Sequence, residues 1–161
     1  MDQDINLYPQ LEVVDKQNHL LALMIEPLVH SQGLYHRSVA VLTFSKDQKL
    51  ILIKRQNPNK PFCNYYDLPY THLQAGKSYY ETASNLIYDQ FNIRPNNLHF
   101  IDIVSPKKNP FQEFIYLYKC ILNLNSNSIL NSKHTCIEQK IDSSLPFTPL
   151  VITLHEHNYL F

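Results

Sequence analysis

The 161-residue sequence contains only two glycines, Gly33 and Gly76. A Walker loop or a GxGxxG turn needs several glycines close together, so the composition excludes both. Any phosphate must therefore be bound by groups other than a glycine-rich loop. Cysteine is also scarce. Its three copies are far apart and in no CxxC spacing, which argues against a disulfide framework and against a cysteine-based zinc site. They are Cys63, Cys120 and Cys136.

Excess charge and long apolar runs are missing as well. The 14 Lys and Arg residues balance the 14 Asp and Glu residues, so the sequence predicts no binding to a nucleic acid polymer or to an anionic membrane. No run approaches the roughly 18 apolar residues of a membrane span. Residues 1–4 lack the basic and apolar parts of a signal peptide. We therefore expect a cytoplasmic protein.

The composition that remains is that of a folded chain. Hydrophobic residues make up 44% and charged residues 17%, which is too apolar for a disordered segment because burial can offset the ordering entropy. The length is close to the roughly 100–200 residues of one domain. We expect residues 1–161 to form a single domain.

Apolar and β-branched residues gather in short runs separated by polar or proline-containing breaks, a pattern typical of strands. Residues 16–19 and 45–48 are polar breaks of hairpin length. Residues 27–35, 57–70 and 123–132 are predicted loops, the second of them with a short strand. The predicted strands are 11–15, 20–25, 38–44, 50–53, 98–104 and 113–122.

A helical period replaces this pattern in the middle of the chain. Over residues 78–91, apolar residues recur every three or four positions, which places them on one stripe of a helix. Ser78 and Glu81 have the spacing of a capping box, and Pro149 suits the first turn of a shorter helix over 149–159. The order of elements predicts a mixed α/β or α+β sandwich with helices covering a central sheet.

Four segments carry recognisable motifs. Residues 34–44 read LYHRSVAVLTF, and residues 50–56 read LILIKRQ and are followed by Lys60. Residues 66–93 are a loop, a helix and a second loop, and residues 146–149 read PFTP. In these segments, which extend over most of the chain, the sequence resembles the Nudix superfamily, in particular the branch that includes isopentenyl-diphosphate isomerase. Residues 66–93 stand in the place of the Nudix box.

This resemblance implies a fold and an activity. The fold is a Nudix-like α/β/α sandwich, with a mixed central sheet, the box helix and a C-terminal helix. The activity is hydrolysis of a nucleoside diphosphate linked to another moiety, with Mg²⁺ or Mn²⁺ as cofactor. The implied partner is a small-molecule diphosphate or nucleotide.

The Nudix box of this sequence has lost most of its acidic residues. Positions that carry glycine, glutamate or arginine in the family pattern are occupied by Thr71, Lys77, Asn85, Leu86, Asp89, Gln90 and Asn92. Only Asp89 keeps a carboxylate, and Lys77 places a positive charge beside it. Since Mg²⁺ needs several hard oxygen ligands, we expect weak metal binding at the box and weak catalysis.

Asp89 is then the candidate metal ligand and catalytic residue of the box. Glu81 lies eight residues earlier, nearly on the same helical face, so the two carboxylates could form an oxygen site. An active hydrolase would use Asp89, with Glu81 or Glu113, to hold the ion that polarises the phosphoryl group. Alternatively, the face is solvated and Glu81 serves only the start of the helix.

A second candidate metal site consists of His36, His72 and Glu113. The isomerase branch holds a metal with His and Glu residues from these segments, and imidazoles with a carboxylate suit Zn²⁺, Mn²⁺ or Fe²⁺. His30 lies six residues before His36. The isomerase cysteine falls on Tyr70, a poor replacement for a thiol in acid–base chemistry. Alternatively, the histidines are ordinary hydrogen-bonded residues and Glu113 is solvated.

Three basic residues, Lys54, Arg55 and Lys60, could receive a diphosphate because Arg offers forked donors and Lys a point charge. An exposed strand end is the alternative. Three functions stay open at this point. They are a diphosphate hydrolase with a degraded box, a non-catalytic module that binds a nucleotide or a protein, and an isomerase-like protein without the catalytic cysteine.

Overall fold

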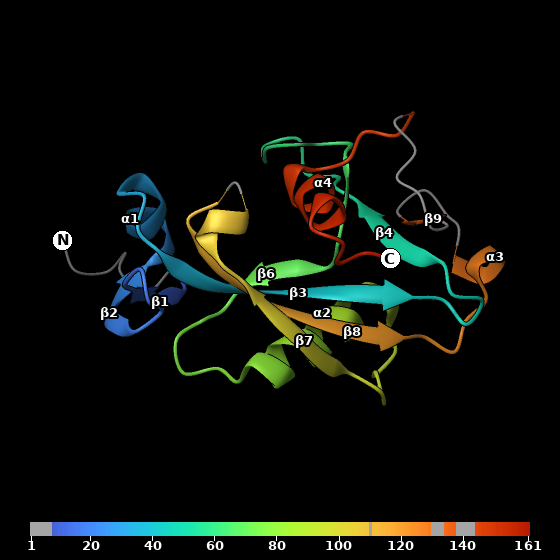
Figure 1. Cartoon of the computed structure of the whole chain (residues 1–161), viewed down its shortest axis with the longest axis horizontal. Helices are drawn as coiled ribbons and strands as arrows, with labels where there is room; N and C mark the ends of the chain where they lie inside the picture. Colours follow the sequence, from blue (N-terminus) through green and yellow to red (C-terminus); the bar gives the residue numbers. More distant parts are fainter. Residues whose placement is uncertain (1–7, 110, 130–133, 138–143) are drawn as a thin grey trace.

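Nine strands among the described residues form one mixed sheet, with helices on both of its faces (Figure 1). The computed structural model describes residues 8–109, 111–129, 134–137 and 144–161. The strands are β1 (Gln10–Val14), β2 (Leu20–Ile25), β3 (His36–Phe44), β4 (Leu50–Lys54), β5 (Tyr66–Asp67), β6 (Tyr70–His72), β7 (His99–Val104), β8 (Glu113–Ile121) and β9 (His134–Ile137). The helices are α1 (Glu26–Ser31), α2 (Tyr79–Phe91), α3 (Ser126–Ile129) and α4 (Pro149–Glu156), with a 3₁₀ turn at Pro106–Lys108. Within these ranges, none of the helices has the length and apolar character that crossing a membrane requires.

Strand β3 lies at the centre of the sheet. It pairs in parallel with β8 along its whole length, starting with His36 opposite Glu113. It also pairs in antiparallel fashion with β6, where Ser38 lies opposite His72. Further antiparallel pairs join β3 to β1 and β4. The beginning of β3 therefore lies beside the beginning of β8 and the end of β6.

Alternate residues of β3 point to opposite faces of the sheet and meet different helices. Ala40 and Leu42 pack in one core with the buried side chains of α4. Val39 and Val41 pack in a second core with the buried side chains of α2. The sheet thus lies between two helical layers, and Figure 1 shows α4 and α2 on either side of β3. The predicted α/β/α sandwich with a mixed central sheet is confirmed.

Both ends of helix α2 follow from local chemistry. The Ser78 hydroxyl accepts a hydrogen bond from the backbone N–H of Glu81 at 3.3 Å, so the predicted helix start is confirmed. The helix ends at Phe91 because Asn92 adopts the left-handed conformation, with a φ of 56°. Asparagine tolerates this conformation better than most residues. Asn92 therefore provides the helix stop at a position where the Nudix pattern has glycine.

The sequence patterns did not predict α1, α3 or β9. Helix α1 occupies part of the predicted loop 27–35, and α3 occupies part of the predicted loop 123–132, of which residues 130–132 lie outside the described residues. At 6 and 4 residues, these helices are too short to show a helical period. Pro27 lies in the first turn of α1, where proline is well tolerated. The last helix ends at Glu156, before the predicted 159.

Cys120 is expected to resist alkylation in the folded protein. Burial raises the pKa of its thiol to about 11, and the contact with Thr43 opposes this only in part. Since the thiolate is the reactive form, roughly one thiol in a thousand is available at pH 8. After treatment with iodoacetamide, peptide mass mapping should find Cys63, which is half-buried, modified well before Cys120. Equal labelling of the two in native protein would contradict the buried position; in urea, both should react.

Candidate functional site

Three polar side chains gather where β3, β6 and β8 meet. His36 begins β3, Glu113 begins β8, and the two are direct partners in the parallel ladder. His72 ends β6 opposite Ser38, which shares a face of β3 with His36 because it lies two positions further along. Strand register alone therefore brings His36, His72 and Glu113 to one face at one end of the sheet.

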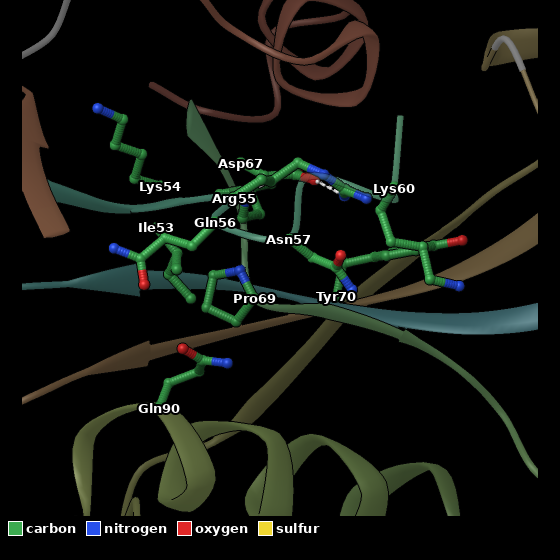
Figure 2. A pocket seen from close by; sticks show the side chains of 11 residues that line it. Ile53, Lys54, Arg55, Gln56, Asn57, Lys60, Asp67, Pro69, Tyr70 and Gln90 are labelled. Atoms are coloured by element: carbon green, nitrogen blue, oxygen red, sulfur yellow. Dashed lines mark hydrogen bonds and ion pairs between the residues drawn. The ribbon is translucent and has the colours of Figure 1, made fainter. Parts of the chain in front are cut away.

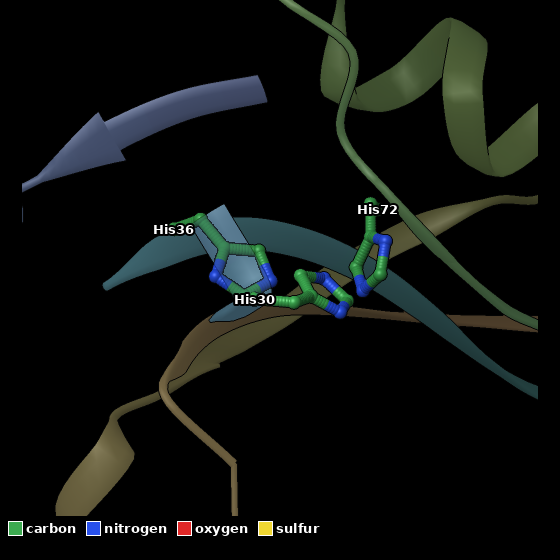
Figure 3. A group of neighbouring side chains, drawn as sticks. All are labelled: His30, His36 and His72. Carbon is green, nitrogen blue, oxygen red and sulfur yellow. The ribbon is translucent and has the colours of Figure 1, made fainter. Parts of the chain in front are cut away.

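Helix α1 adds a third imidazole to this group. The ring centroid of His30 lies 5.1 Å from that of His36 and 4.7 Å from that of His72. Figure 3 shows the three rings close together at the start of β3. One ring nitrogen from each lies within 4.8 Å of the others. The described residues contain no other group of three or more His, Cys, Asp or Glu side chains placed closely enough to hold a metal ion.

Glu113 connects the histidines to Tyr70. Its Oε1 atom lies 3.4 Å from Nε2 of His36 and 3.5 Å from Nε2 of His72. Its other oxygen, Oε2, accepts a hydrogen bond from the Tyr70 hydroxyl. The Glu113 side chain is buried, and the Asn109 amide binds its backbone carbonyl at 2.9 Å, which fixes the start of β8. The carboxylate is therefore held between the imidazoles on one side and a phenol on the other.

The electrostatics of this group favour positive charge at its centre. Burial opposes ionisation of Glu113, but the contacts with the imidazoles and Tyr70 hold its pKa well below the usual range. Burial opposes protonation of His72, but Glu113 and Glu26 together raise its pKa. Burial, followed by the two neighbouring imidazoles, lowers the pKa of His30. Carboxylates and a neutral imidazole thus surround a place that suits a cation.

The donor set fits a divalent transition-metal ion. Nδ1 of His36 lies 2.9 Å from the carbonyl oxygen of Leu34, and Nδ1 of His72 lies 3.2 Å from Oε1 of Glu26. In the neutral rings the hydrogen therefore sits on Nδ1, which leaves a lone pair on Nε2. Nε2 of His36 is buried without a hydrogen-bond partner in the described part of the chain. Imidazoles whose outer nitrogen donates to a carbonyl or a carboxylate are typical metal ligands.

A cavity of about 400 Å³ opens over the histidines and Glu113. Arg55 and Lys60 also line it, so two positive charges share the cavity with the candidate metal ligands. Arg55 is held in place because its Nη1 donates to Asp67 at 2.8 Å and its Nε to the carbonyl of Pro61 at 3.1 Å. The apolar part of the wall consists of Val29, Leu34, Phe62, Phe111 and Leu150.

A second cavity, of about 360 Å³, shares Arg55, Lys60, Asp67 and Tyr70 with the first (Figure 2). Lys54 lines this second cavity and does not line the one that contains the histidines. Of the three basic residues selected from the sequence, Arg55 and Lys60 therefore share a cavity with the candidate metal ligands. Tyr70 lines both cavities.

Comparisons with known proteins give a fold but no closer relative. No protein-family model matches the sequence, and no curated protein matches it. Among solved structures, DR0079 from Deinococcus radiodurans is similar, with a TM-score of 0.64, 17% identity and coverage of 80% of this chain and 82% of that one. A mutT/nudix family protein from Listeria innocua matches with a TM-score of 0.60, 10% identity and coverage of 76% and 90%.

The NUDIX domain of Shewanella oneidensis NrtR, solved with ADP-ribose, matches with a TM-score of 0.55, 14% identity and coverage of 84% of this chain and 99% of that one. The chain has the Nudix fold. Because each of these identities is below 20%, the similarity describes the arrangement of the backbone and not the chemistry of the site.

Within this Nudix fold, most of the residues that the sequence resemblance aligns with the Nudix box line a third cavity, of about 400 Å³. They are Thr71, Lys77, Asn85, Leu86 and Asp89. Asp89 and Glu81 are both exposed and share it with Lys77, whose positive charge opposes a divalent ion there. His72 borders this cavity too, but His36 and Glu113 do not line it. The structure thus places Asp89 and Glu81 in a different cavity from His36 and Glu113, and His72 borders both.

The sequence did not predict two contacts of the site. Glu26 lies beside His72, and Tyr70 binds Glu113 through its hydroxyl. Glu26 has no spacing that marks it as part of a site. The resemblance aligned Tyr70 with the isomerase cysteine, but it did not predict the contact with Glu113, which joins elements far apart in the chain. His30 had a weak signal, its place six residues before His36, but the short helix α1 that turns it toward the group was not predicted.

Proposed function

We propose that this chain is a Nudix-superfamily hydrolase that cleaves the diphosphate bond of a small molecule with the help of a divalent transition-metal ion. The ion would be held by His30, His36, His72 and Glu113, in preference to Mg²⁺ at the degraded box. One observation carries the proposal: these ligands and the cations Arg55 and Lys60 line the same cavity.

The residues have separate tasks in this proposal. Arg55 and Lys60 bind the negative diphosphate, and Asp67 and the Pro61 carbonyl orient the guanidinium toward it. The apolar wall, with Phe62 and Phe111, packs against the group that the diphosphate carries and excludes water from it. A divalent ion held by the histidines and Glu113 would supply Lewis-acid polarisation of a phosphoryl oxygen.

The test is turnover by metal-depleted protein after addition of Mg²⁺, Mn²⁺, Co²⁺ or Zn²⁺. Substrates are nucleoside diphosphate sugars, dinucleoside polyphosphates, NADH, nucleoside triphosphates and isopentenyl diphosphate. We expect turnover with a transition metal, its loss in His36→Ala and its retention in Asp89→Ala, which removes the box carboxylate. Loss in Asp89→Ala with retention in His36→Ala would assign the activity to the box and contradict the proposal. Movement of the double bond in isopentenyl diphosphate would instead support the isomerase-like function.

A second candidate function is a non-catalytic module that binds a nucleotide or a protein through the same cleft. The feature in its favour is that the segment aligned with the Nudix box carries one carboxylate, Asp89, at the positions where the family pattern is acidic, while its helix buries Ala83 and Ile87. Absence of turnover with every metal and substrate, in protein that is folded, would support this candidate. Calorimetry with ADP-ribose and other nucleoside diphosphates would then identify the ligand.

A further inference from the structure

The two oxygens of the Glu113 carboxylate face different partners, and Tyr70 is one of them. The Tyr70 hydroxyl donates a hydrogen bond to Oε2. The other oxygen, Oε1, faces Nε2 of His36 at 3.4 Å and Nε2 of His72 at 3.5 Å. The carboxylate therefore presents one oxygen to the imidazoles while the phenol holds the second.

The backbone fixes Tyr70 in this position. Tyr70 lies opposite Ala40 in the β3–β6 pairing, two positions along from the pairing of Ser38 with His72. Its side chain consequently shares a sheet face with His72, and the two ring centroids are 5.8 Å apart. A ring placed by strand register between two cavities has little freedom to leave Glu113.

The phenol takes part in this contact as a donor. A hydroxyl donates and a carboxylate oxygen accepts, so the hydrogen of the Tyr70 hydroxyl points to Oε2 of Glu113. A phenol that donates to a carboxylate is a poor metal ligand itself, which separates Tyr70 from the ligand set.

We propose that Tyr70 is a positioning residue that makes Glu113 a one-oxygen ligand of the metal ion. The inference rests on the metal centre of the proposed function. Carboxylates bind metal ions through one oxygen or through both, and a catalytic ion needs a position free for water or substrate. With Oε2 held by Tyr70, the ion gains one oxygen from Glu113 and keeps that position open.

Cobalt(II) substitution tests this without any assay of activity, because the intensity of its visible absorption bands falls as the number of ligands rises. Metal-depleted wild type, Tyr70→Phe and the control Tyr66→Phe are titrated with CoCl₂. In Tyr70→Phe both carboxylate oxygens are free, so we expect a change of band position, about a two-fold loss of intensity and, from loss of the supporting hydrogen bond, roughly 10-fold weaker binding. Tyr66→Phe also loses a hydroxyl, but one that does not hold Glu113, and should match wild type.

The outcomes separate the two proposals. If wild type binds one Co²⁺ and Tyr70→Phe binds it with the same spectrum and affinity, the role of Tyr70 is overturned and the metal centre stands. If wild type fails to bind Co²⁺, or if His36→Ala binds it as tightly as wild type, the metal centre is overturned and the role of Tyr70 falls with it.

If Tyr70→Phe does not fold, a second variant tests the same inference. Glu113→Gln keeps the shape of the side chain but offers one oxygen only. If Glu113 already binds through one oxygen, this variant binds Co²⁺ more weakly with bands of wild-type intensity. If the bands become more intense, the wild-type carboxylate binds through both oxygens and the proposal is wrong.

Discussion

Replacing His36 by alanine is expected to weaken transition-metal binding roughly 100- to 1000-fold. Structural zinc sites bind with about 10–16 kcal/mol through four ligands, so one ligand accounts for about a quarter of that energy. His36 should contribute its full share because its side chain is buried and Leu34 already orients its ring through Nδ1. Isothermal titration of metal-depleted protein with Zn²⁺ or Co²⁺ measures the change.

Thermal unfolding gives a second measurement of the same effect. A metal ion that binds the native state alone raises the melting temperature, in proportion to the logarithm of its concentration over Kd. Wild type should therefore melt at a higher temperature with Zn²⁺ than with a chelator, and this difference should be clearly smaller in His36→Ala. His155→Ala is the matched control, since this histidine is exposed on α4. Equal metal responses in wild type and His36→Ala would remove His36 from the site.

Replacing Asp67 by alanine is expected to lower the free energy of unfolding by about 2–4 kcal/mol. Asp67 is 6% exposed, and its carboxylate accepts hydrogen bonds from Arg55, from the Thr148 hydroxyl at 2.8 Å and from the backbone N–H of Leu68 at 2.9 Å. Breaking a buried ion pair costs about 3–5 kcal/mol; the lower range allows for the partial exposure of Arg55. Urea unfolding followed by circular dichroism measures the loss.

Asp67 also stabilises the start of helix α4. Thr148 is the residue that precedes α4, so the hydrogen bond from its hydroxyl joins the start of this helix to β5. Thr148→Val removes this one bond and should cost about 1 kcal/mol. A loss in Asp67→Ala no larger than that in Thr148→Val would show that the Arg55 pair contributes nothing to stability.

The long helix could be predicted from the sequence, and the short helices α1 and α3 could not. Helix α2 was predicted because its 13 residues repeat the apolar stripe several times. Helix α1, with 6 residues, has no room for such a repeat, and Pro27 and Gly33 made its segment resemble a loop. What forms α1 is its position between β2 and the start of β3, where Val29 packs against β1.

The candidate site, too, could be predicted from the sequence only in part. The family resemblance selected His36, His72 and Glu113, and strand register brings them together. Glu81 and Asp89 were paired by helical spacing, which describes a helix face but not the cavity that this face lines. The contact of Tyr70 with Glu113 depends on two pairings with β3 at once, and no local pattern contains that information.

The parallel pairing of β3 with β8 also sets when the site can form. His36 and Glu113 come from opposite halves of the chain and meet at the first position of that ladder. Closing so long a loop carries an entropy cost that must be met before its contacts stabilise the chain, so parallel strands of this kind fold slowly. Under the proposed function, an ion that needs both residues would bind only after this barrier has been crossed. It would then lengthen the lifetime of the folded state by slowing unfolding.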